Sequence, residues 1–396
     1  MTPYMKHLAE TVSRPAPVSP RLCAPLLALL LVSGASATQD LAAGLKEKLD
    51  ELSARAGFPG ATFSILLGDG RVLDVASGWV DADHRQPLTP ESRMPAGSVG
   101  KTFVAAAILQ AVDDGVLDLD SPIGKWIGQE SWFPRLPNAR TLTLRLLLSH
   151  RSGVPDSDET AFMKAVTTNV DKTWTPAELI AFVLDKKPRF SAGSKYFYTD
   201  MNYIIAGAVF ERAVGRPLFD EIDRRLVTPF SLSRTTPSER RDLTGVVAGH
   251  LDMKGNDYRK FGLPDTSLRD GRFTYNAQAE YAGGGMISTS HDLAQWAAVL
   301  WSGRAFSAAR LADMLDGKPS EKAVKYGLGA EIRASGRGPM YLHDGWIFGY
   351  TTVMLYLADE HISAAIQVNS DPMPPSKLQA GDVIGSLVSY VLKEKR

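Results

Sequence analysis

The 396-residue sequence predicts an α+β fold, in which an antiparallel sheet built from both termini is flanked by helices and carries a largely helical inserted subdomain. Two observations lead to this prediction. Segments of strand length lie near both ends of the chain, and the residues between them are rich in helix start signals. We expect one domain over residues 38–396, with a sheet lobe of about 41–120 and 280–396 and a helical lobe of about 121–279.

The first elements are a helix and a hairpin. Residues 41–56 have the spacing of an amphipathic helix, which ends at a segment containing two glycines and a proline. Residues 61–67 and 71–79 have strand patterns on either side of Asp69-Gly70. Because Asp-Gly favours a tight turn, these two strands are predicted to pair as a β-hairpin.

Capping signals predict helices in the middle of the chain, and strand patterns follow near its C-terminal end. Thr175 and Thr289 each begin a capping box, while Gly215 and Gly303 follow helical patterns as terminators. The predicted later helices cover residues 143–150, 175–187, 200–214, 293–301 and 377–393, and the predicted C-terminal strands cover residues 326–333, 340–343, 349–357 and 361–369.

The first 37 residues have the pattern of a secretory signal peptide. Three basic residues precede an apolar stretch from 22 to 32, and an Ala-x-Ala sequence follows at 35–37. We therefore expect cleavage after Ala37, a periplasmic or secreted mature protein, and no stable membrane span after cleavage.

Composition excludes several function classes. Lys+Arg and Asp+Glu both total 44, so no basic excess indicates nucleic acid as a partner. The single cysteine, Cys23, lies inside the predicted signal, which leaves no disulfide framework and no thiol nucleophile. No His or acidic spacing is typical of a metal site, and no glycine-rich phosphate loop follows a strand. The prediction is therefore an enzyme without metal or cofactor.

Ser98 and Lys101 form the main candidate for chemistry. Breaks at Pro95 and Gly97 precede an apolar run with helical spacing, which places Ser98 in the first turn of a buried helix. Residues three apart share a helix face, so the Ser98 hydroxyl and the Lys101 amine can meet. A serine beside an amine has the layout of an activated nucleophile.

Two later segments could complete such a site. Tyr198 lies in a predicted loop just before a helix, so its hydroxyl can project into a cleft as a second base. A predicted strand ends at His343-Asp344-Gly345. The backbone N–H of Trp346 could then form an oxyanion hole together with the N–H of Ser98.

These motifs resemble, in their order and approximate spacing, the penicillin-recognising serine hydrolases. That family holds class C β-lactamases, D-Ala-D-Ala carboxypeptidases, D-aminopeptidases and related esterases. The resemblance extends over about residues 41–391 and rests on Ser98-x-x-Lys101, Tyr198-x-Asp200, His343-x-Gly345 and the stretches 147–155 and 282–289.

The resemblance implies a β-lactamase/transpeptidase-like fold and an acyl-enzyme mechanism. Ser98 would attack a carbonyl of a small-molecule or peptide acyl donor, and Lys101 and Tyr198 would move protons. The backbone amides of Ser98 and Trp346 would hold the oxyanion.

The resemblance also gives supporting roles to Asp200, His343 and Gly345 at the substrate. His-x-Gly, in place of the Lys-Thr-Gly of class C β-lactamases, is more similar to the peptidase, aminopeptidase and esterase branches. The first expectation is therefore a D-Ala peptidase- or esterase-like enzyme. A class C-type β-lactamase and a non-catalytic relative that binds cell-wall peptides are the alternatives.

Asp200 departs from the Tyr-x-Asn that is usual in the family. A carboxylate near Lys101 would favour the ammonium form of that amine, which weakens it as a free base and strengthens it as a cation beside a Tyr198 phenolate.

His150, in a predicted loop, is expected only to organise the hydrogen bonds of a turn. Residues 96–100 are one residue away from the Gly-x-Ser-x-Gly elbow of α/β-hydrolases, but that elbow needs a preceding apolar strand. The segment before Ser98 is polar and broken by proline.

Overall fold

A computed structural model describes residues 24–81, 86–252, 258–320, 324–374 and 377–394, with side chains described from residue 39 onward. Most of the predicted signal segment, residues 1–23, lies outside this range, so the signal and its cleavage after Ala37 stay predictions. No helix among the described residues is long and apolar enough to cross a membrane.

One eight-stranded sheet contains strands from both ends of the chain, and all its neighbouring strands are antiparallel. Its order is β2-β1-β13-β12-β11-β10-β9-β8. The N-terminal strand β1 pairs with the C-terminal strand β13, where Phe63 lies opposite Ile366. The predicted α+β fold with a sheet from both termini is therefore confirmed. The strands are β1 (Gly60–Leu66), β2 (Val72–Gly78), β8 (Lys318–Pro319), β9 (Lys325–Tyr326), β10 (Glu331–Ser335), β11 (Gly338–Ile347), β12 (Tyr350–Leu357) and β13 (Ile362–Val368).

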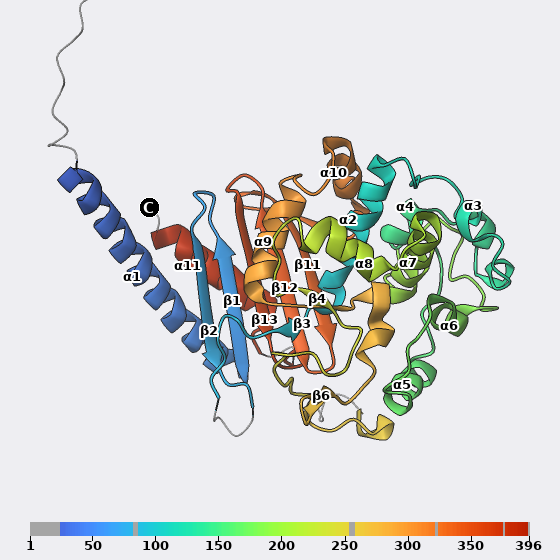
Figure 1. Cartoon of the computed structure of the whole chain (residues 1–396), viewed down its shortest axis with the longest axis horizontal. Helices are drawn as coiled ribbons and strands as arrows, with labels where there is room; N and C mark the ends of the chain where they lie inside the picture. The colour runs from blue at the N-terminus through green and yellow to red at the C-terminus, as the bar shows by residue number, and fades with distance from the viewer. Residues whose placement is uncertain (1–23, 82–85, 253–257, 321–323, 375–376, 395–396) are drawn as a thin grey trace, which may run out of the picture.

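Helices cover both faces of this sheet (Figure 1). Successive residues of a strand point to opposite faces. Val353 and Leu355 of β12 accordingly belong to the core shared with α1 (Ala24–Ala56) and α11 (Ala380–Glu394). Met354 and Tyr356 belong to the core shared with α2 (Gly100–Asp113) and α9 (Ser290–Trp301). Both faces of the central strands are thus buried.

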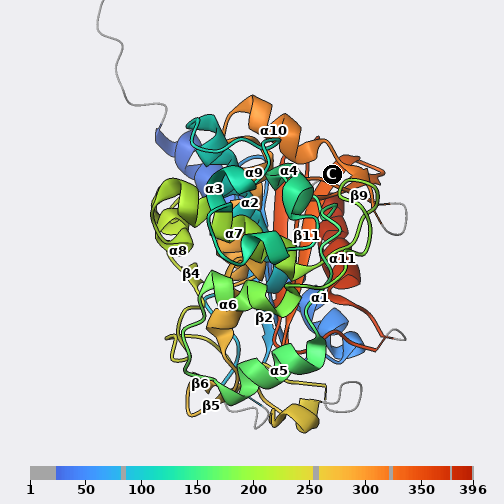
Figure 2. The same cartoon turned by 90° about the vertical axis from the view of Figure 1, so that its right-hand side faces the viewer.

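The inserted residues are mainly helical and lie on the side of the molecule away from α1 and α11, where Figure 2 turns them toward the viewer. A small three-stranded sheet joins this part to the rest, with β3 (Met94–Pro95) and β4 (Thr236–Pro237) on either side of β7 (Met286–Ser288). Within the inserted residues, β5 (Leu268–Arg269) pairs with β6 (Arg272–Phe273). The other helices are α3 (Gly124–Ile127), α4 (Leu144–Leu148), α5 (Glu159–Thr168), α6 (Pro176–Ile180), α7 (Asp200–Val214), α8 (Leu218–Ile222) and α10 (Ala308–Leu315).

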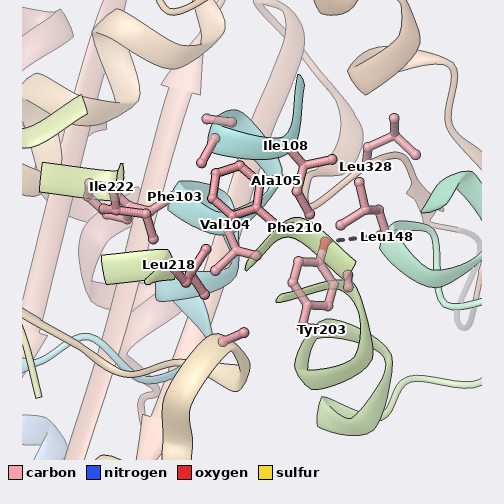
Figure 3. Packing of buried hydrophobic residues seen from close by; sticks show 14 of the residues in the cluster. Phe103, Val104, Ala105, Ile108, Leu148, Tyr203, Phe210, Leu218, Ile222 and Leu328 are labelled. Atoms are coloured by element: carbon pink, nitrogen blue, oxygen red, sulfur yellow. Dashed lines mark hydrogen bonds between the residues drawn. The ribbon is translucent and has the colours of Figure 1, made fainter. Parts of the chain in front are cut away.

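Helix α2 is the centre of the larger core. Phe103 is fully buried, and its ring stacks on that of Trp296 in α9 with 4.4 Å between the ring centroids. Figure 3 shows Val104, Ala105 and Ile108 of α2 packed among side chains of neighbouring elements, including Phe210 of α7. Burial on all sides fixes the helix that carries Lys101.

Three sequence predictions differ from the structure. Ser98 lies in a separate 3₁₀ turn, Gly97–Val99, rather than in the first turn of α2. The predicted strand 326–333 is interrupted between β9 and β10, where Gly329 adopts a positive φ of 78°. Strand β11 does not end at the His-x-Gly motif but continues to Ile347, because it stays paired with β12 over its full length.

Two predicted helix boundaries also move. The first helix begins at Ala24 instead of residue 41, and the helix predicted to reach residue 187 ends at Ile180 and continues as a 3₁₀ turn to Val183. The predicted hairpin, the capping box at Thr175 and the helix 200–214 match the structure closely. Thr289 caps α9 by accepting from Asp292 N, but the capping box is not completed there, because the Asp292 carboxylate accepts from Arg234 N and Thr235 Oγ1.

Replacing Phe103 with alanine should remove one ring of the stacked pair and leave a cavity beneath the site. We expect a loss of about 3–5 kcal/mol in the free energy of unfolding, measured by urea denaturation. Val116→Ala is the control, because Val116 is 39% exposed, and it should change stability by less than about 0.5 kcal/mol. Equal losses in the two variants would contradict the central place of α2 in the core.

Candidate active site

Lys101 is completely buried and makes three polar contacts. Its Nζ donates to Ser98 Oγ at 2.8 Å, to Asp200 Oδ1 at 2.5 Å and to the backbone carbonyl of Gly283. An ammonium has three protons to donate, and all three have an acceptor here. The ion pair with Asp200 and the other two hydrogen bonds offset part of the cost of burying this amine.

Tyr198 lies beside the same pair. Its side chain lines the cleft together with Ser98, and Lys101 Nζ lies 5.0 Å from the centre of its ring. Burial and then the charge of Asp200 raise the pKa of Tyr198 well above its usual value, against the smaller opposing effect of the Ser98 hydrogen bond. The resting site therefore holds a protonated phenol next to an ammonium.

The backbone around Trp346 lies directly against the backbone around Ser98. A Cβ added to Gly345 would lie 2.9 Å from Ser98 N and 2.1 Å from Ala96 O. A Cβ added to Gly97, where φ is +52°, would lie 2.7 Å from Trp346 N. Only glycine at both positions allows this approach. This approach brings the backbone of Trp346 next to that of Ser98; the oxyanion hole made from their amides stays a prediction.

The run of three glycines at 283–285 packs against the 3₁₀ turn Gly97–Val99 that carries Ser98. A Cβ on Gly284 would lie 2.8 Å from the carbonyl carbon of Gly97, and one on Gly100 would lie 2.9 Å from that of Gly284. Gly283 supplies the carbonyl that contacts Lys101. The stretch 282–289, quoted above for its resemblance alone, thus forms part of the site.

His343 is buried behind the site rather than on its surface. Its Nδ1 lies 2.6 Å from the backbone carbonyl of Asp344, to which it donates, and its Nε2 lies 2.9 Å from Tyr326, from which it accepts. Burial lowers the pKa of His343, so the ring is neutral at pH 7. Asp344, Gly345 and Trp346 are the residues of this segment that line the cleft.

Ser98 and Tyr198 open into a cleft of about 720 Å³. Its wall is apolar in one part and acidic in another. The apolar and aromatic lining includes Phe162, Met163, Tyr258, Phe261, Trp346 and Phe348. Among the residues that the structure describes, the charged lining consists of Asp156, Glu159, Asp200, Glu280, Glu331 and Asp344 with Lys260 and Arg333 as bases. Arg333 forms an ion pair with Glu331.

Two carboxyl groups of this wall were not anticipated from the sequence. Asp156 accepts a hydrogen bond from Thr199 Oγ1 at 2.9 Å, and burial together with the charge of Asp200 raises its pKa. Burial and the charge of Asp200 raise the pKa of Glu280 to about 7. Neither residue belongs to a motif, so only the three-dimensional arrangement shows their proximity to Asp200.

Fold and site together define a known family of serine hydrolases. A family model described as Beta-lactamase matches residues 45–388, and the chain belongs to this family. A D-aminopeptidase of Brucella anthropi is 26% identical over 315 residues, which are 78% of this chain and 56% of that protein. The chain therefore spans little more than half the length of that relative.

Two further relatives match over most of their length. Esterase EstB of Burkholderia gladioli is 26% identical over 379 residues, which cover 87% of this chain and 86% of the esterase. The solved structure of a D-amino acid amidase from Ochrobactrum anthropi SV3, complexed with L-phenylalanine amide, is 25% identical. It matches with a TM-score of 0.74 over 90% of this chain and 98% of that chain. The predicted resemblance is confirmed, including the β-lactamase/transpeptidase-like fold.

Glu280→Gln should stabilise the protein increasingly as the pH rises. The pKa of Glu280 is raised to about 7 in the folded state from about 4.5. The protonated form therefore favours folding below pH 4.5, and this contribution is lost as the pH rises through 7. Glutamine imitates the protonated form at every pH. The variant's advantage in Tm over the unchanged protein should grow between pH 5 and pH 8.

Glu178→Gln is the control with the opposite sign, because hydrogen bonds lower the pKa of Glu178 to about 2. Its Tm difference should be negative and flat over the same interval. A flat difference for Glu280→Gln as well would show that Glu280 ionises normally.

Proposed function

We propose that this protein is a serine hydrolase that cleaves an amide or ester bond through an acyl-enzyme on Ser98. The observation that carries the proposal is the 2.8 Å hydrogen bond between Lys101 Nζ and Ser98 Oγ, with the ring of Tyr198 beside the same amine. In this proposal Ser98 is the nucleophile, Lys101 and Tyr198 exchange protons, and the backbone amides of Ser98 and Trp346 bind the oxyanion.

The reaction begins when the Lys101–Tyr198 pair has lost one proton. Ser98 Oγ then attacks the carbonyl carbon of the acyl donor and gives its proton to that pair. The amides of Ser98 and Trp346 stabilise the oxyanion, and the pair returns the proton to the leaving amine or alcohol as its bond to the acyl carbon breaks. Water hydrolyses the ester on Ser98 by the same steps, and the carboxylic acid leaves.

We infer amino-acid amides, D-Ala-type peptides and small esters as the classes of acyl donor. The D-aminopeptidase, the amidase and the esterase among the relatives support this range. The excess of carboxylates in the cleft favours donors with a free amino group or no charge, since an anionic group would approach carboxylates. A β-lactam carries such a carboxylate and is less favoured for that reason. A D-Ala-D-Ala peptide carries one too, so its place in this range rests on the D-aminopeptidase among the relatives and not on the charge of the cleft.

Fluorophosphonate labelling tests the nucleophile independently of the substrate. The unchanged protein should be labelled at Ser98, and Ser98→Ala should lose both the labelling and all hydrolysis. Ser157→Ala is the matched control, since Ser157 lines the same cleft, and it should be labelled normally. Labelling that persists in Ser98→Ala would refute the assignment, and an unchanged protein that is not labelled would be a non-catalytic binding relative.

Rates on D-phenylalanine amide, a D-Ala-D-Ala peptide, a p-nitrophenyl ester and nitrocefin, measured side by side, assign the class of acyl donor. Under our proposal the amide, peptide or ester exceeds nitrocefin in kcat/KM. A preference for nitrocefin would favour the class C-type β-lactamase.

Asp200→Asn should shift the acid limb of the pH–rate profile to lower pH. Asp200 raises the pKa of Tyr198 and pairs with the ammonium of Lys101, so its removal eases loss of a proton from that pair. The expected shift is about one to three pH units. Asp316→Asn is the control, because Asp316 forms an ion pair with Lys318 at the surface and does not line the cleft. An unmoved acid limb would show that Asp200 does not act on the bases.

A further inference from the structure

His150 adopts an uncommon backbone conformation in a completely buried position. It follows the end of α4, and its φ of +56° lies in the left-handed region that few residues other than glycine adopt. Histidine is among the residues that tolerate this region. The sequence nevertheless places a bulky ring here, where glycine would cost less strain.

The main chain on both sides of Tyr198 is bonded to His150. The N–H of Phe197 donates to the carbonyl of His150 at 2.9 Å. The N–H of Thr199 points to His150 Nδ1 over a longer distance of 3.4 Å. The residue between these two donors is Tyr198, so His150 fixes the backbone immediately before and after it.

The ring of His150 also lies on the ring of Tyr198. The two centroids are 4.1 Å apart and the planes meet at 31°. Tyr203 and Tyr326 pack around the same imidazole at 5.3 and 5.1 Å. One face of the Tyr198 phenol is therefore closed by a ring whose own movement is blocked by its neighbours.

A fixed tautomer completes the arrangement. Asn202 accepts from Ser152 through its Oδ1, so its Nδ2 donates to His150 Nδ1, at 3.0 Å. Since Nδ1 accepts, the proton of the neutral ring is on Nε2, which is buried without a hydrogen-bond partner among the described residues. A second proton on Nδ1 would face two donors, and burial and the charge of Lys101 lower the pKa of His150 accordingly.

We propose that His150 is a positioning residue for the reaction at Ser98: its carbonyl, its Nδ1 and its ring hold the Tyr198 phenol against the nucleophile. The inference rests on the proposed function and adds a residue to it. His150 stays neutral and exchanges no proton with the substrate. It acts through Tyr198 alone.

The test is a double-mutant cycle between His150 and Tyr198, read as the rate constant for labelling of Ser98 by a fluorophosphonate. His150→Asn keeps a residue that tolerates positive φ and removes the ring. In the unchanged background it should slow labelling by about 10- to 100-fold, the loss expected when a catalytic group moves by roughly 1 Å. In the Tyr198→Phe background it should slow labelling by less than about twofold, because the group that it positions is already absent.

His361→Asn is the matched control. His361 also has a positive φ, of 51°, and its ring is hydrogen-bonded to Tyr356 at 3.1 Å, but it does not line the cleft. It should label at the unchanged rate. Asn202→Ala provides a second variant if His150→Asn does not fold, because Asn202→Ala removes a donor to His150 Nδ1 and leaves residue 150 intact. The Asn202→Ala variant should slow labelling of Ser98 by a smaller factor, and this effect should also disappear in the Tyr198→Phe background.

Equal fold-losses for His150→Asn or Asn202→Ala with and without the Tyr198 hydroxyl would overturn the proposal and assign His150 to general packing. That result is distinct from failure of the proposed function, in which Ser98 of the unchanged protein is not labelled at all.

Discussion

The buried ammonium of Lys101 is the constraint on which the site depends. A charge with no exposure is tolerated only when it is paired and fully hydrogen-bonded, and its three acceptors come from three separate parts of the chain. Ser98 belongs to the 3₁₀ turn before α2, Asp200 to the first turn of α7 and Gly283 to the segment before β7. Satisfying one amine therefore brings the sheet-linked and helical parts of the molecule together at the nucleophile.

The second constraint is the closeness of three stretches of main chain. Residues 96–98, 284 and 345–346 approach so closely that a Cβ on any of the facing glycines would overlap backbone atoms. Backbone cannot move aside as a flexible side chain can, so these positions exclude every other residue. Strand β11 supplies this approach because it remains paired to β12 beyond His343. The rigidity of the sheet thus sets the position of the Trp346 amide relative to Ser98.

Much of this fold and site could be predicted from the sequence. The features that could not be predicted depend on contacts between residues far apart in the chain. The hairpin and helix α7 were predictable because Asp-Gly turns, N-caps and terminal glycines act over a few residues. The 3₁₀ turn at Ser98 was not, since it results from packing against Gly284 and Trp346, far away in the chain. Motifs gave Ser98, Lys101, Tyr198 and Asp200 as a group.

Contacts made only in three dimensions account for what sequence patterns missed. Glu280 is close to Asp200 only after folding, and His150 was interpreted as an ordinary turn residue because nothing local shows a ring beside Tyr198. His343 was expected in a supporting role at the substrate. Its ring is buried and hydrogen-bonded to Tyr326, and the role itself stays a prediction.

Asp200 has two effects that oppose each other at the same nucleophile. Its carboxylate stabilises the ammonium of Lys101, and the resulting cation favours a phenolate at Tyr198. The same carboxylate disfavours that phenolate directly and raises the pKa of Tyr198. An asparagine, as is usual in the family, would keep a hydrogen bond to the amine and remove both effects of the charge. Because the net charge of Lys101 and Asp200 together is zero, the phenol loses the help of an unpaired cation, and the geometric restraint on Tyr198 gains importance for bringing its oxygen to Ser98.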